Sequence, residues 1–373
     1  MQRQITPNFV IEASYVANRG VWWMLPAANT YGFLNQVSPA AFAAVGLQPY
    51  TNPADNLLLN STIGSAAVVQ RVGTISPYPG YATSNTLINA LRPYPQFSTI
   101  ALQNSPTGNT WYDSLQVKGT KRMSHGLQVN GTFTWAKSLV SIRPNLFVES
   151  RKSLETTDQP FVFNANILYT TQNYFKNRML SLATRDWSAG AFIQWGSGLP
   201  LTPPAATNTN YIGGSEMFRV PGVPLYLKDL NCGCINPYQD VVLNPAAWVN
   251  PANGAFGPAT GTLYGDFRQA RRPQENFNFG RTFKLRGEGS KMAFSVRAEF
   301  TNIFNRTQIG NPVTSAPGTP PSKNAAGQYS GGFGVINLTV SGPNTAPSYT
   351  QNAVVGQLFQ LPRSGTLIAR FTF

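Results

Sequence analysis

Apolar and polar residues alternate at every second position in eight segments of the chain. The clearest segment places Leu127, Val129, Gly131, Phe133 and Trp135 on one side and Gln128, Asn130, Thr132 and Thr134 on the other. A period of two is that of a β-strand whose two faces meet different surroundings. The pattern predicts strands near residues 8–18, 110–122, 127–138, 160–170, 186–197, 275–286, 291–304 and 364–373.

Strand length and aromatic placement indicate that these strands cross a membrane. Each is about 10 residues long, the length that a tilted strand needs to span a bilayer. Trp111, Trp135 and Trp195 stand at the ends of apolar stripes, so we expect them at the membrane interface, where aromatic girdles form. The strands of a soluble antiparallel sandwich also alternate, but such a domain rarely contains long loops without secondary structure.

The links between the strands alternate strictly in length. Short links follow Arg122 and Leu285, and a moderate one lies near 171–184, whereas long links occupy about 19–108, 139–158, 199–272 and 305–362. Outer-membrane barrels have short periplasmic turns and long external loops. The sequence therefore predicts an all-β, antiparallel transmembrane β-barrel with long external loops, whose C-terminal Phe373 lies at the periplasmic face.

Composition excludes several other classes of protein. Of the 373 residues, 11% are charged, against about 25% in ordinary soluble domains. The aromatic content of 12% is too high for a disordered chain, and two cysteines are too few for a disulfide-stapled scaffold. Proline interrupts the longest uncharged stretch, Gly20–Ala54, so no apolar helical span of about 18 residues exists. Residues 1–20 lack the apolar core of a signal peptide, which predicts that the chain begins inside a longer structure.

The residues that usually carry enzyme chemistry are isolated from one another. The single histidine, His125, lies in a Ser-His-Gly turn, and no phosphate-binding glycine motif follows a strand. Cys232 and Cys234 form either a loop disulfide or free thiols, because two soft ligands do not complete a metal site. Three loop carboxylates are interpreted as solvated charge: Glu149, Glu155 and Asp158. We expect no enzyme activity, no cofactor and no metal.

A formal charge of +14 raises the question of a nucleic-acid partner. No recognition helix or base-stacking module accompanies the charge, and Arg297 and Glu299 fit a polar barrel interior. Nine basic residues instead cluster at the short-turn ends of strands, beside the phospholipid headgroups of a barrel: Lys118, Lys121, Arg122, Lys176, Arg178, Arg185, Lys284, Arg286 and Lys291. We therefore expect outer-membrane lipid, and not nucleic acid, as a partner.

The long links contain aromatic residues whose flat faces suit contact with a sugar or a siderophore. They are Trp22, Trp23, Tyr31, Phe33, Tyr78, Tyr81 and Tyr94 in the first link and Trp248 and Tyr264 in the third. Functional residues are frequent in loops. The alternative is that these rings only pack the loops against each other.

Four motifs, in order, resemble the C-terminal barrel of TonB-dependent receptors of the Oar-like type, which carry a carboxypeptidase regulatory domain and are common in acidobacteria. They are LRPYPQF with NTWYDSLQVK, KRMSHGL and TWAKS in 91–140, RDWSAGAFIQWGSGLPLTP (185–203), FSVRAEFTNIFNRTQIGNP (294–312) and the terminal LIARFTF (367–373). The acidic loop and the D-x-R-H-R strand start of the family are replaced here by SLVSIRPNLFVES and by Asp158-Gln159-Pro160-Phe161.

The resemblance implies that residues 1–373 are the last eight strands of a plugged barrel of about 22 strands, without plug, signal peptide or TonB box. It implies energy-coupled uptake of a glycan or a siderophore across the outer membrane, with contact to TonB only through the missing N-terminal parts. Leu367, Ala369, Phe371 and Phe373 would be the signal read by the barrel-assembly machinery. The alternatives are a passive outer-membrane channel, a surface adhesin or, less well supported, a soluble all-β lectin or enzyme.

Overall fold

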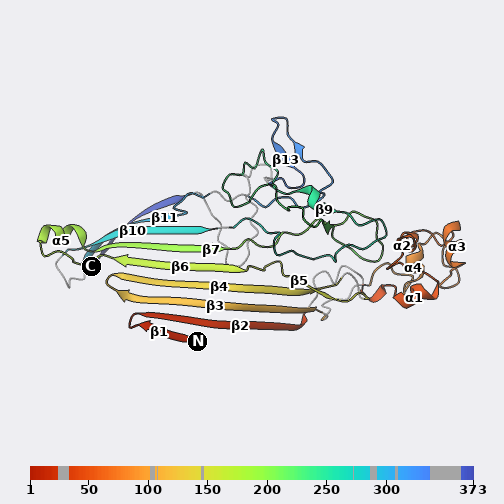
Figure 1. The fold of residues 1–373 in the computed structure, drawn as a ribbon, viewed down its shortest axis with the longest axis horizontal. Coiled ribbons are helices and arrows are strands. Elements are labelled where there is room, and N and C mark those ends of the chain that lie inside the picture. Colours follow the sequence, from red (N-terminus) through yellow and green to blue (C-terminus); the bar gives the residue numbers. More distant parts are fainter. Residues whose placement is uncertain are drawn as a thin grey trace.

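One antiparallel sheet of ten strands organises the chain (Figure 1). The computed structural model describes residues 1–23, 33–100, 106, 108–143, 147–271, 273–285, 292–306, 310–336 and 363–373, with only the backbone of Phe33. The strands follow the order β1-β2-β3-β4-β6-β7-β10-β11-β14, and β5 pairs with β4 beyond that path. Their bounds are β1 Gln2–Thr6, β2 Phe9–Trp23, β3 Gly108–Ser124, β4 Leu127–Ile142, β5 Arg151–Leu154, β6 Phe161–Thr170, β7 Trp187–Gly196, β10 Gln274–Lys284, β11 Ala293–Thr301 and β14 Ser364–Thr372.

Each of the eight predicted strands is present in the sheet, and each pairs with the next one along the chain. Strands β2 and β3 extend further than predicted, to 15 and 17 residues. Sequence alternation missed β1 and β5, because β1 is mostly polar and β5 has only 4 residues. Within the described residues the sheet is not closed, and β1 and β14 are its two edges.

Short and long links lie at opposite ends of the sheet, as the sequence predicts. The β1–β2 and β3–β4 turns gather at one end, together with helix α5 (Arg178–Thr184) and the C-terminus (Figure 1). The β3–β4 turn has positive φ at both central residues, His125 (50°) and Gly126 (80°), the geometry that matches the twist of a two-residue hairpin. We call this the short-turn end and the opposite one the loop end.

Two of the long links are folded rather than structureless, which corrects the expectation from the sequence. The β2–β3 loop contains the turn η2 (Phe33–Asn35) and four short helices: α1 (Pro39–Ala44), α2 (Pro53–Leu58), α3 (Ala66–Val72) and α4 (Leu87–Ala90). Asparagine or serine side chains cap α1 and α2, and a proline begins each. A core of its own, including Phe42, Leu59 and Leu87, holds this loop together.

The β7–β10 loop also has its own core. Trp248, Phe267 and Leu243 are buried in it, and Phe333 and Ile336 of the β11–β14 loop complete it. Its regular structure is limited to η3 (Pro245–Ala247) and the pair β8 (Phe218–Arg219) and β9 (Trp248–Val249), beside which lies the hairpin β12 (Ser322–Lys323) and β13 (Tyr329–Gly331). None of the helices in the described ranges is long and apolar enough to span a membrane.

Candidate functional site: two sheet faces and the loop assembly

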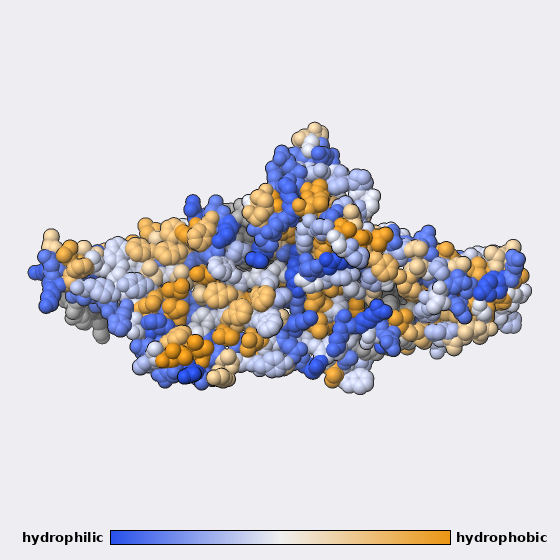
Figure 2. Space-filling model, in the orientation of Figure 1, coloured by the Kyte–Doolittle hydropathy of each residue, from blue (hydrophilic) through white to orange (hydrophobic). Residues whose placement is uncertain are grey.

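One face of the sheet is apolar and largely uncovered. Directly paired residues share a face, and one row of pairs crosses six strands: Leu127, Tyr169, Ala189, Phe279, Ala298 and Leu367. Exposed Tyr15, Phe133, Trp135, Phe161, Trp195 and Phe371 lie on the same face. Figure 2 shows hydrophobic side chains gathered over the strands. Such an area of exposed apolar surface fits contact with lipid, and we call this the outward face.

The opposite, inward face is polar. One row of paired residues reads Glu12, Lys118, Thr132, Asn164, Gln194 and Gln274. Lys118 Nζ lies 3.8 Å from Glu12 Oε2, and Arg297 Nη2 lies 2.6 Å from Glu299 Oε1. Both ion pairs agree with the predicted polar interior. Val140 and Ile142, at the loop end of this face, pack against Ala259 of the β7–β10 loop. The β7–β10 loop therefore packs against the loop end of the inward face, on which Val16 and Phe192 are exposed apolar residues.

Aromatic and charged residues mark the loop-end boundary of the outward face. One paired row consists of Tyr15, Leu115, Trp135 and Phe161. The next row toward the loop end contains Asp113 and Lys137. Trp111 lies one row closer still to the loop end. The Lys152 Nζ atom is 4.4 Å from its ring centroid, and the Arg19 guanidinium group lies over the same ring. Trp135 thus stands at the edge of the apolar band, whereas Trp111 lies among charges beyond it. Trp195 lies one row nearer the short-turn end, and its indole N–H donates to Glu275 Oε1 at 3.0 Å.

The structure separates the predicted ligand-contact aromatics into exposed and buried groups. Trp22, Trp23, Tyr78 and Tyr94 are exposed. Trp248 is 6% exposed and packs edge-on against Phe267, and Tyr81 is 8% exposed, so burial removes both from the rings that a ligand can reach. Tyr264 is half-buried against Trp248. Tyr31 and the side chain of Phe33 lie outside the described residues.

A pocket of about 270 Å³ lies where the β2–β3 loop meets the β7–β10 loop. Tyr50, Arg92 and Asn35 come from the first loop, and Asn210 and Tyr211 come from the second. None of the predicted ligand-contact aromatics whose side chains the structure describes lines this pocket. Sequence inspection missed its residues because they lie far apart in the chain and form no motif.

Asp158 connects the strand wall to the β7–β10 loop. Its side chain is 1% exposed, and its Oδ2 atom lies 2.6 Å from Arg268 Nη2. Its Oδ1 atom accepts a hydrogen bond from the Ser138 N–H at 2.7 Å, while Arg268 Nη1 donates to the carbonyls of Asp158 and Gly198. The interpretation of Asp158 as solvated charge is therefore wrong, because a buried carboxylate is retained where a cation and backbone donors satisfy it.

Glu216, in the β7–β10 loop, is also a buried carboxylate, but no cation pairs with it in the described part of the chain. It is 3% exposed, its Oε1 atom accepts from the Gly261 N–H at 3.0 Å, and its Oε2 atom has no hydrogen-bond partner among the described residues. Burial raises the pKa of Glu216, and the Gly261 N–H offsets this in part. The carboxyl group therefore favours its protonated form more in the folded loop than in an unfolded chain.

Glu216→Gln is expected to stabilise the loop by about 1 kcal/mol at neutral pH. The raised pKa makes wild-type stability highest at acid pH and lowers it as the pH rises through the folded-state pKa. The neutral amide removes this loss, so the advantage of the variant should vanish in acid. Protease resistance of the β7–β10 loop, measured at both pH values, checks this, and an advantage of equal size at both would contradict it.

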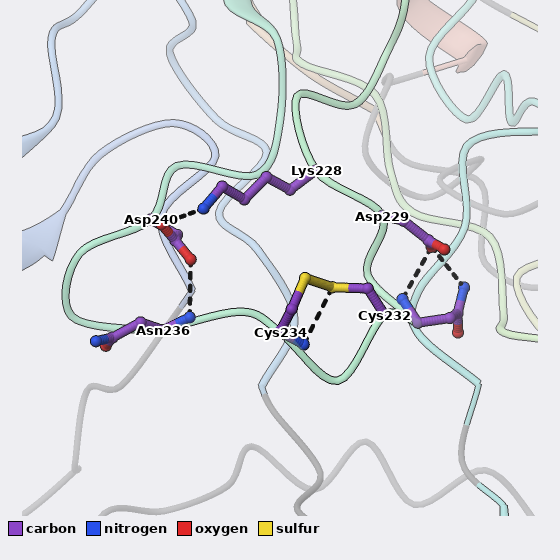
Figure 3. The surroundings of a disulfide bond; sticks show 7 residues. Lys228, Asp229, Cys232, Cys234, Asn236 and Asp240 are labelled. Carbon is purple, nitrogen blue, oxygen red and sulfur yellow. Dashed lines mark hydrogen bonds and ion pairs between the residues drawn. A yellow bond between two sulfur atoms is a disulfide. The ribbon is translucent and has the colours of Figure 1, made fainter.

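Cys232 and Cys234 form a disulfide, which resolves the alternatives left by the sequence. The bond lies in a turn of the β7–β10 loop that is fixed by nearby polar contacts (Figure 3). Lys228 Nζ lies 2.6 Å from Asp240 Oδ1, the Asn236 N–H donates to Asp240 Oδ2 at 2.8 Å, and the Asn231 N–H donates to Asp229 at 2.9 Å. Both sulfur atoms therefore belong to a structural disulfide of this loop.

The described residues contain no group of His, Cys, Asp and Glu side chains that would hold a metal ion. Comparison with curated proteins and with solved structures gave no match. Residues 1–346 match the family model described as an outer membrane beta barrel domain. The match agrees with the two-faced antiparallel sheet and with links that alternate between a short-turn end and a loop end. The chain belongs to the outer membrane β-barrel domain family, and its location is the outer membrane.

Proposed function

We propose that this chain forms the wall and the external cap of a TonB-dependent receptor that takes up a glycan or a siderophore. The observation that carries the proposal is the combination of a two-faced sheet with folded loops, one of which packs against the loop end of the inward face and which together enclose a pocket. A general pore needs no such structure over its lumen. The outward face contacts lipid, and the loop end meets the external medium.

The open sheet supports a larger barrel. Backbone groups on the outer edges of β1 and β14 have no strand partner among the described residues, and in a bilayer each unsatisfied group costs several kcal/mol. We propose that further strands cover both edges, giving a barrel of about 22 strands whose size admits a plug. The plug and its contact with the TonB complex belong to those further parts of the receptor.

The test is uptake by cells that carry the gene in its own genomic context. Cells with the gene, cells without it and cells without TonB are compared for growth on oligosaccharides and on siderophore-bound iron. We expect growth on one of these nutrients to be lost both in the cells without the gene and in the cells without TonB. Uptake that needs the gene but not TonB would identify a passive channel, and loss of surface attachment without loss of uptake would identify an adhesin.

Phe373 provides a prediction about assembly. Leu367, Ala369 and Phe371 alternate along β14, and Phe373 follows at the short-turn end with 90% exposure. We propose that the barrel-assembly machinery reads this edge by strand addition, in which backbone groups pair and alternate side chains enter pockets. Deleting Phe373 should then lower the amount assembled in cells far more than it lowers the unfolding stability of refolded protein. Equal losses would show that Phe373 is only an interfacial anchor.

A further inference from the structure

The pocket between the β2–β3 and β7–β10 loops has walls that are fixed in place. Asn56 Nδ2 donates to Asn210 Oδ1 at 3.2 Å, and the Tyr211 N–H donates to Asn56 Oδ1 at 3.1 Å. Tyr50 stacks on Phe256 with the rings 5.9 Å apart. These contacts join residues on both sides of the pocket, so the cavity is formed before any ligand arrives, as is usual for ligand sites.

Asn35 fixes the segment that follows Arg92. Its Nδ2 atom donates to the carbonyls of Tyr94 and Phe97, and its Oδ1 atom accepts from the Tyr94 N–H at 2.9 Å. Asn35 is 2% exposed, and these bonds commit both ends of its amide. The amide therefore holds one wall of the pocket, while the neighbouring arginine remains available to a ligand.

Among the described residues that line the pocket, Arg92 alone is charged. Within the described part of the chain, its guanidinium group makes no hydrogen bond and no ion pair. Arg71 of the same loop differs, since its Nε atom lies 3.1 Å from Asp55 and its Nη2 atom donates to the Gly46 carbonyl. Burial lowers the pKa of Arg92, and the group stays protonated because an arginine remains charged in proteins. A partly desolvated cation without an acceptor favours an anionic partner.

We infer that this pocket binds the carboxylate of an acidic sugar, with Arg92 holding the carboxylate and Tyr50 and Tyr211 lining the space for the ring. The planar guanidinium group matches a carboxylate through two parallel hydrogen bonds. A volume of about 270 Å³ lies below the usual range of sites for drug-sized ligands, so the pocket accepts a single ring of a longer chain. The inference rests on the proposed uptake function and names the class of nutrient.

The experiment measures equilibrium binding of a labelled glucuronate-containing disaccharide to outer-membrane fractions that contain the assembled receptor. Its neutral glucose counterpart and inorganic sulfate are the comparison probes. Wild type should prefer the acidic disaccharide, and Arg92→Gln should weaken its binding about tenfold or more, the range expected for a charge-assisted contact. Arg92→Lys should retain part of the affinity. Lys323→Gln, which removes one exposed positive charge outside the pocket, should bind as wild type does.

Three outcomes would overturn the inference. One is equal binding of the acidic and neutral disaccharides. Another is an Arg92→Gln variant that is present at the wild-type level in the membrane and binds as wild type does. The third is sulfate binding as tight as that of the disaccharide, which would remove the role of the sugar ring. If the acidic sugar fails but TonB-dependent uptake of another nutrient is found, the receptor function stands and only the substrate class is wrong.

Discussion

Replacing Asp158 by Ala is expected to release the β7–β10 loop from the strand wall, with a loss of about 3–5 kcal/mol. The substitution leaves Arg268, whose side chain is 14% exposed, without its counter-ion, and it removes the acceptor of the Ser138 N–H. Breaking one partner of a buried ion pair is costly because the remaining charge is desolvated and uncompensated. Limited proteolysis of intact cells checks this, since the released loop should be cleaved much faster.

Asp266→Ala is the matched control. Asp266 pairs with Arg219 of the same loop at 2.8 Å, but the two side chains are 57% and 35% exposed. Ion pairs exposed to this degree contribute about 0–1 kcal/mol, so cleavage should stay close to that of wild type. Equal effects of the two variants would show that the Asp158–Arg268 pair does not join the loop to the wall.

Val117→Arg is expected to destabilise the barrel by about 2–4 kcal/mol, the cost of a cation on the lipid face near the midplane of the bilayer. On the outward side of β3, a charged residue lies on either side of Val117 along the strand. Asp113, at the loop end, accepts a hydrogen bond from the Tyr15 hydroxyl, and Lys121 Nζ reaches the Ser124 and Leu127 carbonyls at the short-turn end. Val117 lies midway, paired with Ala13 and Phe133.

The neighbouring Gln116 provides the control on the other face. It pairs with Ser14 and Thr134 in a polar inward row, so Gln116→Arg should change stability little. Urea unfolding in lipid vesicles and the amount assembled in the outer membrane measure both variants. Equal tolerance at the two positions would contradict the assignment of the faces.

Most of the strand wall could be predicted from sequence, because a strand between lipid and a polar interior has apolar residues on one face and polar residues on the other, in alternation. Where that contrast is weak, the prediction failed. Strand β1 alternates poorly, and β5 pairs only with the loop end of β4. The folded loops were missed because their short helices and irregular turns, such as α4 with 4 residues, carry no long periodic pattern.

Residue type alone did not predict which loop side chains meet solvent. Trp248 in the β7–β10 loop is 6% exposed, whereas Trp22, which the sequence also assigned to a loop and which lies at the end of β2, is 78% exposed. The pocket depends on Asn56 meeting Asn210, which are 154 positions apart. The buried role of Asp158 depends on Arg268, which is 110 positions away. Contacts across such distances are set by the tertiary fold and leave no local signature.

In each of the two folded loops, the two ends of the loop lie side by side. This affects how such loops can be exchanged between related barrels. Pro200 and Arg268 form a bridge at the base of the β7–β10 loop, and the Leu34 N–H donates to the Ile100 carbonyl at 3.3 Å at the base of the β2–β3 loop. Each loop thus leaves and rejoins the scaffold at neighbouring points. The buried core of the β2–β3 loop consists of its own residues, whereas that of the β7–β10 loop includes Phe333 and Ile336 of the β11–β14 loop. The β2–β3 loop is therefore a cassette: recombination between related genes can replace it whole, changing what the surface recognises while the lipid-facing architecture is inherited intact.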